Sequence, residues 1–273
     1  MLIQTANVKL NLEPGIPDGK KDILLFIHGF TGSALEWQHI FPLINPAYDC
    51  VAVDLVGHGL SDSPESSLYY SASSITSQLY NLIKQLPAKK VILAGYSMGG
   101  RAALSFAVKH PSLIKALILE SASPGIKDVE ERNARINNDE RLVEFILTKG
   151  SNEFVNHWMN IELFSSQKKL PKDILEQQFR AKLKNNKMGL SNSLIGFGTG
   201  TMPQLYDVLE KLNFPALLVT GKLDIKFTQI NSKIVFDFKN AAHTVIADAG
   251  HNAHLEKPDI FSAELNKFLN SLD

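Results

Sequence analysis

The chain has 273 residues, 44% of them hydrophobic, which is enough to bury a full core in one large domain or two small ones. Basic and acidic residues number 28 each, so the net charge is zero. This balance argues against nucleic acid or an anionic membrane as the main partner. Without a secretory signal, a long apolar run or a second cysteine beside Cys50, the sequence predicts a soluble, cytoplasmic protein without disulfides. We expect Cys50 to be a buried core thiol, because it begins an apolar run.

Strand and helix patterns alternate over the first 122 residues. Residues 2–12 partly alternate apolar and polar side chains, which predicts an edge hairpin or strand. Short apolar runs after this segment predict buried strands, and apolar residues at helical spacing predict helices between them. The strands are expected at 23–27, 50–55, 91–94 and 116–119, and the helices at 35–44, 71–86 and 98–110. This alternation indicates a mostly parallel sheet with helices on both faces.

The pattern changes after Ala122, because only charged helical segments follow until about residue 203. Strand signals resume at 216–221 and 244–246, and an amphipathic helix is predicted at 261–272. The helical segment is too long for a simple connection, so we interpret it as a cap over the carboxyl-terminal edge of the strands. The predicted first part of the core, helical cap and second part of the core span 1–122, 123–203 and 204–273.

A glycine-flanked serine, Ser97, lies between the predicted strand at 91–94 and the helix that follows it. The segment reads GYSMGG, with glycines two residues on either side of the serine. These glycines let the backbone turn sharply, with the serine in a strained conformation and its hydroxyl exposed, as in a nucleophile elbow. Serine is a poor nucleophile or base unless a neighbouring group accepts its proton. The sequence should therefore also supply a histidine and an acid.

Asp224 and His251 are our candidates for these partners. In this topology the order along the chain is serine, then the acid, then the histidine. Asp224 follows the strand at 216–221, and His251 follows the strand at 244–246. Parallel strands all end at the same edge of a sheet, so both side chains are expected beside Ser97.

Other residues compete for both roles. Asp207 and Asp248 are alternative acids, although Asp248 lies only three residues before His251. His254 is an alternative histidine, but it lies further into the following loop or helix. His251, His254 and Glu256 could also suggest a metal site, but a further ligand is lacking, so we predict no metal.

Two backbone amides are expected to stabilise negative charge during the reaction. The amide of Met98 begins the helix after Ser97, where the helix dipole favours an anion. The amide of Phe30 lies in the glycine-rich loop after the strand at 23–27. The alternative is that this loop is an ordinary turn between a strand and a helix.

Arg101 lies one helical turn after Ser97 and on a similar face of the helix. A cation in the first turn of a helix opposes the helix dipole. A substrate that carries a carboxylate would explain it, because a guanidinium binds carboxylates through two hydrogen bonds. The alternative is a structural ion pair with an acid elsewhere.

The predicted cap offers further candidates. Asp128 and Glu131 resemble a capping box, and the helix that they begin carries Arg132 and Arg135 on one face. These arginines could bind substrate, or they could pair with the two acids as a solvated face; the pattern does not separate the two. Trp158 could line the roof of a pocket or anchor the cap.

Several segments together resemble the α/β-hydrolase superfamily over nearly the whole chain: HGFTG, DLVGHGLSD, GYSMGG, GKLD and AGHNAHLEKP. The chain is more narrowly similar to the 2-succinyl-6-hydroxy-2,4-cyclohexadiene-1-carboxylate synthase family of menaquinone biosynthesis. That similarity lies in GYSMGGR, SASPGIKDVEERNARINNDERL, the cap tryptophan, GFGTGTMPQLYDVL, LDIKF and AGHNAHLEKP.

The resemblance implies an α/β-hydrolase fold and a lyase without a cofactor, which eliminates pyruvate from a small polycarboxylate. Ser97 would then act as a base, activated by His251 and Asp224, with the amides of Phe30 and Met98 as the oxyanion hole. The residues at the substrate-binding positions would be Tyr96, Arg101, Arg132, Arg135 and Trp158. We expect a monomer or weak homo-oligomer without nucleic acid or stable membrane association. The alternatives are a carboxylesterase, lactonase or C–C bond hydrolase that forms an acyl-enzyme, and a non-catalytic ligand receptor.

Overall fold

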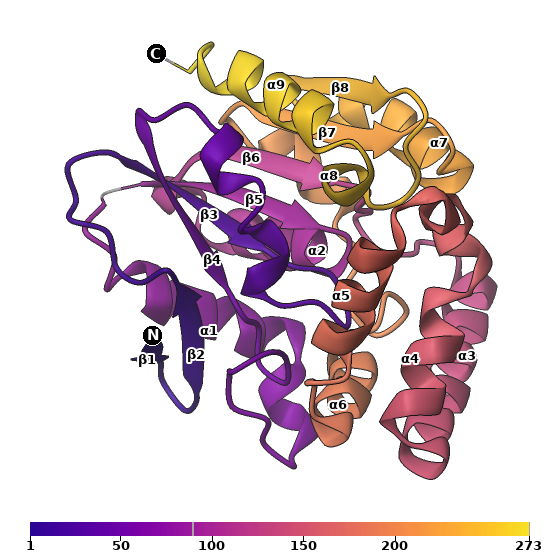
Figure 1. The fold of residues 1–273 in the computed structure, drawn as a ribbon. Coiled ribbons are helices and arrows are strands. Elements are labelled where there is room, and N and C mark those ends of the chain that lie inside the picture. Colours follow the sequence, from indigo (N-terminus) through magenta and orange to yellow (C-terminus); the bar gives the residue numbers. More distant parts are fainter. Residues whose placement is uncertain (89, 273) are drawn as a thin grey trace.

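The computed structural model describes residues 1–88 and 90–272. Lys89 and Asp273, which belong to the predicted core parts, lie outside the described residues. Within the described ranges, one sheet of eight strands has the order β1-β2-β4-β3-β5-β6-β7-β8 (Figure 1). The strands are β1 (Leu2–Gln4), β2 (Lys9–Glu13), β3 (Asp22–Ile27), β4 (Tyr48–Val53), β5 (Val91–Tyr96), β6 (Ile114–Glu120), β7 (Ala216–Gly221) and β8 (Ala241–Ile246).

The sheet is parallel except at one edge. Strands β1 and β2 form an antiparallel hairpin, and β2 also pairs antiparallel with β4. From β4 to β8 in the spatial order, all neighbours are parallel, with Leu25 of β3 opposite both Val51 and Leu93. The predicted edge hairpin and mostly parallel sheet are therefore confirmed.

Helices cover both faces of the sheet, so the central strands are apolar on both sides. Leu25 and its odd-numbered neighbours in β3 pack with helices on one face, and Leu24 and Phe26 pack with those on the other. The first face carries α1 (Ala72–Ile83), α2 (Met98–Lys109) and α7 (Ile225–Ile234); the second carries η1 (Ala34–Trp37), α8 (Ala253–Glu256) and α9 (Pro258–Leu269).

The predicted helix at 35–44 is wrong. This segment forms two short 3-10 helices, η1 and η2 (Phe41–Leu43). Pro42 lies within the segment, and a proline inside an α-helix removes a hydrogen bond and clashes with the preceding turn. The break also lets Trp37 pack against Phe26 of the sheet, with ring centroids 4.8 Å apart.

Two smaller expectations also need correction. Cys50 is only partly buried, because it lies in the first half of β4 beside a surface hollow that Lys21 and Asp49 also line. Burial still raises the pKa of its thiol to about 12. Helix α9 begins earlier than predicted, because Pro258 suits the first turn of a helix.

The segment between β6 and β7 contains α3 (Val129–Lys149), α4 (Ser151–Met159), η5 (Glu162–Lys169), α5 (Lys172–Lys182) and α6 (Lys187–Phe197). We refer to these five elements as the cap. Figure 1 shows them beyond the arrowheads of the parallel strands. The cap has its own apolar cluster, made by Ile146, Phe154, Val155, Leu190 and Leu194. The predicted outer bounds, 123 and 203, stay a prediction.

The end of α5 and the turn before α6 are fixed to the core. The ammonium group of Lys182 lies 3.1 Å from a carboxylate oxygen of Glu36, and both side chains are nearly buried. Asn185 donates to the carbonyl of Thr31 at 2.7 Å and accepts from the amide of Gly59 at 3.0 Å. These contacts hold the loop after β3, which carries Phe30, under the cap.

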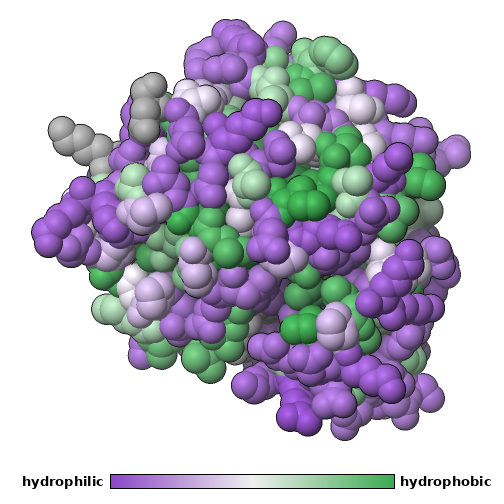
Figure 2. Space-filling view, turned by 45° about the horizontal axis from the view of Figure 1, so that its top comes forward, coloured by the Kyte–Doolittle hydropathy of each residue, from purple (hydrophilic) through white to green (hydrophobic). Residues whose placement is uncertain are grey.

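The outer surface is mixed in character. On the face shown in Figure 2, hydrophilic residues predominate and apolar residues form small separate patches. No helix in the described part of the chain is both long and apolar enough to cross a membrane. The remaining short 3-10 helices are η3 (Ser67–Tyr70), η4 (Pro111–Leu113), η6 (Tyr206–Lys211) and η7 (Val235–Asp237).

Candidate active site

Ser97 occupies the turn between β5 and α2. Its backbone has φ 51° and ψ −106°, a region that non-glycine residues rarely adopt. The turn is tight, because a Cβ atom at Gly99 would collide with the carbonyl oxygens of Ile27 and His28. The amide of Ser97 donates to the carbonyl of Glu120 at 2.8 Å, which ties the turn to β6. The predicted sharp turn is therefore present.

The structure brings Ser97, His251 and Asp224 together. The hydroxyl of Ser97 donates to Nε2 of His251 at 3.0 Å, and Nδ1 of His251 donates to Oδ2 of Asp224 at 2.6 Å. His251 and Asp224 are buried, at 1% and 6% exposure, whereas Ser97 is partly exposed. This chain of hydrogen bonds can move a proton from the serine to the histidine, while the carboxylate stabilises the resulting imidazolium.

The competing residues lie elsewhere. Asp248 is exposed, and Asp207 forms an exposed ion pair with Lys127 at 2.9 Å. His254 is buried, and its Nδ1 donates to Glu120 at 2.7 Å. Neither aspartate nor His254 replaces a member of the hydrogen-bonded set.

Glu120 supports both the serine and the histidine loop, and the sequence analysis missed it. Its carbonyl receives the amide of Ser97, and its buried carboxylate receives both the amide and the ring Nδ1 of His254 at 3.0 and 2.7 Å. Glu256 accepts from the amide of Gly250, next to His251, at 2.8 Å, and burial raises its pKa. The available signal was an acid at the end of the apolar strand ALILE.

The two expected oxyanion donors come from the loop after β3 and from the start of α2. Phe30 is outside any helix or strand, and its amide has no acceptor among the described residues. Met98 is the first residue of α2, where amides lack an acceptor one turn earlier. Both residues line the same cavity as Ser97. The oxyanion hole remains a prediction that this placement supports.

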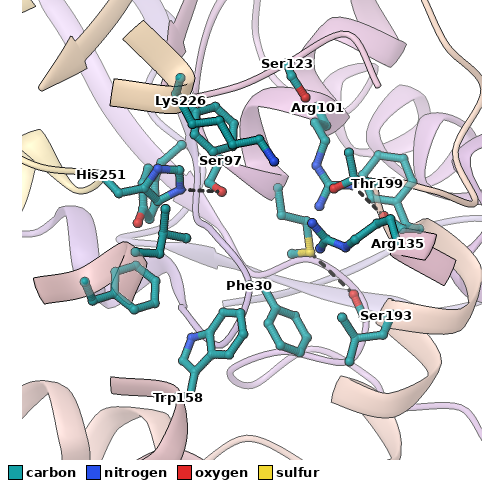
Figure 3. A pocket seen from close by; sticks show the side chains of 18 residues that line it. Phe30, Ser97, Arg101, Ser123, Arg135, Trp158, Ser193, Thr199, Lys226 and His251 are labelled. Carbon is teal, nitrogen blue, oxygen red and sulfur yellow. Dashed lines mark hydrogen bonds between the residues drawn. The ribbon is translucent and has the colours of Figure 1, made fainter. Parts of the chain in front are cut away.

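A cavity of about 160 Å³ lies between the sheet edge and the cap, and Figure 3 shows its lining. Ser97 and His251 are at one side of it, and Arg101 and Arg135 are at the other. Most of the remaining wall is made of apolar and hydroxyl side chains: Phe30, Tyr96, Met98, Ser123, Trp158, Leu163, Phe164, Ser193, Leu194, Phe197, Thr199 and Phe227. The cavity therefore offers a reactive hydroxyl opposite fixed positive charge.

Arg101 is a buried cation without an acidic hydrogen-bond partner among the described residues. Its Nη1 donates to the carbonyl of Phe197 at 2.7 Å and to the sulfur of Met202 at 3.6 Å. Burial, together with the nearby charge of Arg135, lowers its pKa to about 9. A carboxylate in the cavity would therefore stabilise the charged form. Among the described residues Arg101 forms no ion pair, although the charge of Asp139 is near enough to favour its charged form.

Arg135 lines the cavity and pairs with Asp139, at 2.8 Å between Nε and Oδ1. Asp139 is buried, which raises its pKa, and its Oδ2 has no partner within the described residues. The alternative pairing with Glu131 is not formed among the described residues, because Arg135 pairs with Asp139. Asp128 does cap α3, because its carboxylate accepts from the amide of Glu131 at 2.8 Å.

The chain resembles known proteins over most of its length. A family model for the alpha/beta hydrolase fold matches residues 22–258. A protein of Bacillus subtilis (strain 168), named putative 2-succinyl-6-hydroxy-2,4-cyclohexadiene-1-carboxylate synthase, is 40% identical over 251 residues, covering 92% of this chain and 91% of that protein. The synthase of that name from Enterobacter sp. (strain 638) is 30% identical over 260 residues, covering 94% and 93%.

A solved structure of similar fold and sequence points to the same family. MenH from S. aureus has a TM-score of 0.90 at 30% identity, with 96% of this chain and 98% of that chain covered. The chain belongs to the 2-succinyl-6-hydroxy-2,4-cyclohexadiene-1-carboxylate synthase family. Its α/β-hydrolase fold and its family, both expected from the sequence, are thereby confirmed.

In this member of the synthase family, Arg132 does not line the cavity. Its guanidinium donates to the carbonyls of Gly200 and Met202 at 2.7 and 3.3 Å, so that it holds the segment after α6 against α3. The alternative pairing of Arg132 with Asp128 is not formed among the described residues. A role for Arg132 in direct substrate binding is not supported by this position.

Trp158 and Tyr96 both line the synthase cavity. Trp158 also packs edge-on to Phe30, with centroids 5.2 Å apart, and joins the apolar cluster of the cap. Trp158 therefore has both of the positions that the sequence presents as alternatives: it lines the pocket and it anchors the cap. The ring centroids of Tyr96 and His251 are 5.4 Å apart. Burial raises the pKa of the Tyr96 hydroxyl well above its usual value.

Lys226 is a further cavity residue that the sequence analysis missed. It follows Asp224 by two residues in the first turn of α7. In the sequence, Lys226 lies in the segment LDIKF, which is quoted above only for its resemblance to the synthase family.

The described residues contain no group of three or more side chains that could hold a metal ion.

Proposed function

We propose that this chain is a lyase of menaquinone biosynthesis. It converts 2-succinyl-5-enolpyruvyl-6-hydroxy-3-cyclohexene-1-carboxylate into 2-succinyl-6-hydroxy-2,4-cyclohexadiene-1-carboxylate and pyruvate. The observation that carries this proposal is the hydrogen-bonded set of Ser97, His251 and Asp224 beside a cavity. The same cavity is lined by the buried Arg101, which has no acidic hydrogen-bond partner among the described residues. Membership of the synthase family supports the reaction class.

The reaction is an elimination across the ring. The proton at ring carbon 2, next to the succinyl carbonyl, passes to Oγ of Ser97 as the proton of Ser97 passes to Nε2 of His251. The electron pair forms the double bond between carbons 2 and 3, the existing double bond shifts to carbons 4 and 5, and the bond from carbon 5 to oxygen breaks. The enolpyruvate that leaves takes up one proton and becomes pyruvate. This proton uptake balances the proton that carbon 2 gave to the enzyme.

Each supporting group has a role in this step. Asp224 orients the imidazole of His251 and stabilises its charged form, as in hydrolytic triads. As carbon 2 loses its proton, negative charge develops on the succinyl carbonyl oxygen, where the amides of Phe30 and Met98 would stabilise it. No acyl-enzyme forms, because the serine acts as a base and not as a nucleophile.

The cations match the substrate, which carries carboxylates on its succinyl group, its enolpyruvyl group and its ring. Arg101 would bind a carboxylate in the buried part of the cavity, where such a hydrogen bond is stronger than in water. Arg135, which is partly exposed, would bind a second carboxylate. The aromatic wall formed by Tyr96, Trp158 and their neighbours would contact the ring. In this proposal the enzyme uses no cofactor and acts in the cytoplasm, as a monomer or weak homo-oligomer, on a small polycarboxylate.

The test is a coupled assay of pyruvate release from enzymatically generated substrate, compared with hydrolysis of p-nitrophenyl acetate. We expect rapid pyruvate release and at most slow ester hydrolysis without an initial burst. No pyruvate release together with a burst of nitrophenol would contradict the lyase and favour an acyl-enzyme hydrolase.

Replacing Arg101 with methionine is expected to raise KM about 10- to 100-fold, which corresponds to the loss of a charge-assisted hydrogen bond. The thermal midpoint should not fall, because a buried guanidinium without an acidic partner is costly to hold. Steady-state pyruvate release and thermal unfolding measure the two effects. Arg141→Met, an exposed change on α3, is the control and should alter neither. An unchanged KM in Arg101→Met would refute carboxylate binding by Arg101.

A further inference from the structure

Lys226 presents an exposed ammonium group at the cavity. Figure 3 shows its side chain reaching into the space between Ser97 and Arg101. It differs from the arginines of the cavity in its surroundings, because Arg101 is buried and Arg135 is paired with an acid, whereas Lys226 is exposed.

Lys226 has no ion pair or hydrogen-bonded acid in the described part of the chain. It lies in the first turn of α7, where a positive charge opposes the helix dipole. A ligand with negative charge would offset the unfavourable position, as proposed for Arg101 on α2.

We propose that Lys226 binds the carboxylate of the enolpyruvyl group, the part of the substrate that leaves as pyruvate. This inference rests on the proposed function and names a binding residue within that site. The two arginines on the far side of the cavity, the buried Arg101 and the partly exposed Arg135, would then hold carboxylates that stay with the ring. Pyruvate must reach solvent, and Lys226 is a cavity cation that is itself exposed to solvent.

The chemistry of the side chain fits this role. A lysine is a flexible, strongly hydrated point charge, so it binds a carboxylate without fixing it rigidly and releases it readily. An exposed pair of this kind contributes modestly and is weakened by salt. Lys226 should therefore steer and hold the leaving group without controlling proton transfer by Ser97.

The test compares Lys226→Met, Lys226→Arg and Lys222→Met in the pyruvate-release assay. Lys222 lies two residues before Asp224, is exposed and does not line the cavity, so it is a matched control. We expect Lys226→Met to raise KM about 5- to 10-fold with kcat within about twofold. Lys226→Arg should restore most of the affinity, and Lys222→Met should resemble the unmodified protein.

Product inhibition distinguishes which carboxylate is bound. In Lys226→Met, inhibition by added pyruvate should weaken about fivefold or more, whereas inhibition by the cyclohexadiene product should change less than about twofold. Equal weakening of both, or of neither, would overturn the assignment. If the unmodified protein releases no pyruvate, the proposed function fails; if it does and Lys226→Met behaves normally, only this inference fails.

Discussion

Ser97→Ala should lower kcat for pyruvate release by about 10²- to 10⁴-fold, the usual contribution of a positioned base. The hydroxyl is the group through which the substrate proton reaches His251, and alanine offers no replacement for it. The KM should change less than about threefold, because the cations that bind the carboxylates stay in place. Steady-state and single-turnover assays of pyruvate release measure both quantities.

The matched control is Ser123→Ala. Ser123 also lines the cavity but forms no hydrogen bond to His251 among the described residues. It should keep kcat within about threefold, since a hydroxyl outside the proton path contributes little. A Ser97→Ala variant that retained full activity would contradict the proposed base and revive a non-catalytic role for the chain.

Asp224→Asn should lower kcat by about 10²- to 10⁴-fold while leaving the fold intact. The carboxylate accepts a 2.6 Å hydrogen bond from Nδ1 of His251, which fixes the tautomer with Nε2 free to accept from Ser97. An asparagine amide can donate to Nδ1 instead and favour the other tautomer. It also removes the negative charge that stabilises the protonated ring.

Asp248→Asn is the control for this change. Asp248 lies three residues before His251 but is exposed, and it was the alternative acid from the sequence. Its replacement should leave kcat and the thermal midpoint unchanged. If Asp248→Asn lost activity and Asp224→Asn kept it, the acid would have been wrongly assigned.

The shape of the site depends on residues that touch no substrate. Glu120 connects the turn at Ser97 with the loop that carries His251, through its carbonyl and its carboxylate. Asn185 and Lys182 fix the loop of Phe30 under the cap. The reacting groups come from separate loops, and these buried polar contacts hold the loops in register.

Features that arise from neighbouring residues were predicted well. The alternation of apolar strands and amphipathic helices indicated the parallel sheet, and the glycines around Ser97 indicated the sharp turn. Asp224 and His251 could be chosen because parallel strands place their ends at one edge. The failure at 35–44 is instructive, since the apolar spacing predicted a helix but Pro42 and the burial of Trp37 broke it.

The fold class, the family and the candidate serine could be predicted without the structure, because each depends on local spacing or on motifs read along the chain. Which cations face the cavity could be read only from the folded arrangement of the helices. Arg132 and Arg135 occupy one helix, yet Arg132 binds carbonyls of the segment after α6 and Arg135 reaches the cavity. Lys226 joined them because α7 begins beside Ser97. Long-range packing of the helices against the sheet, and not local spacing, sets which surroundings each side chain reaches.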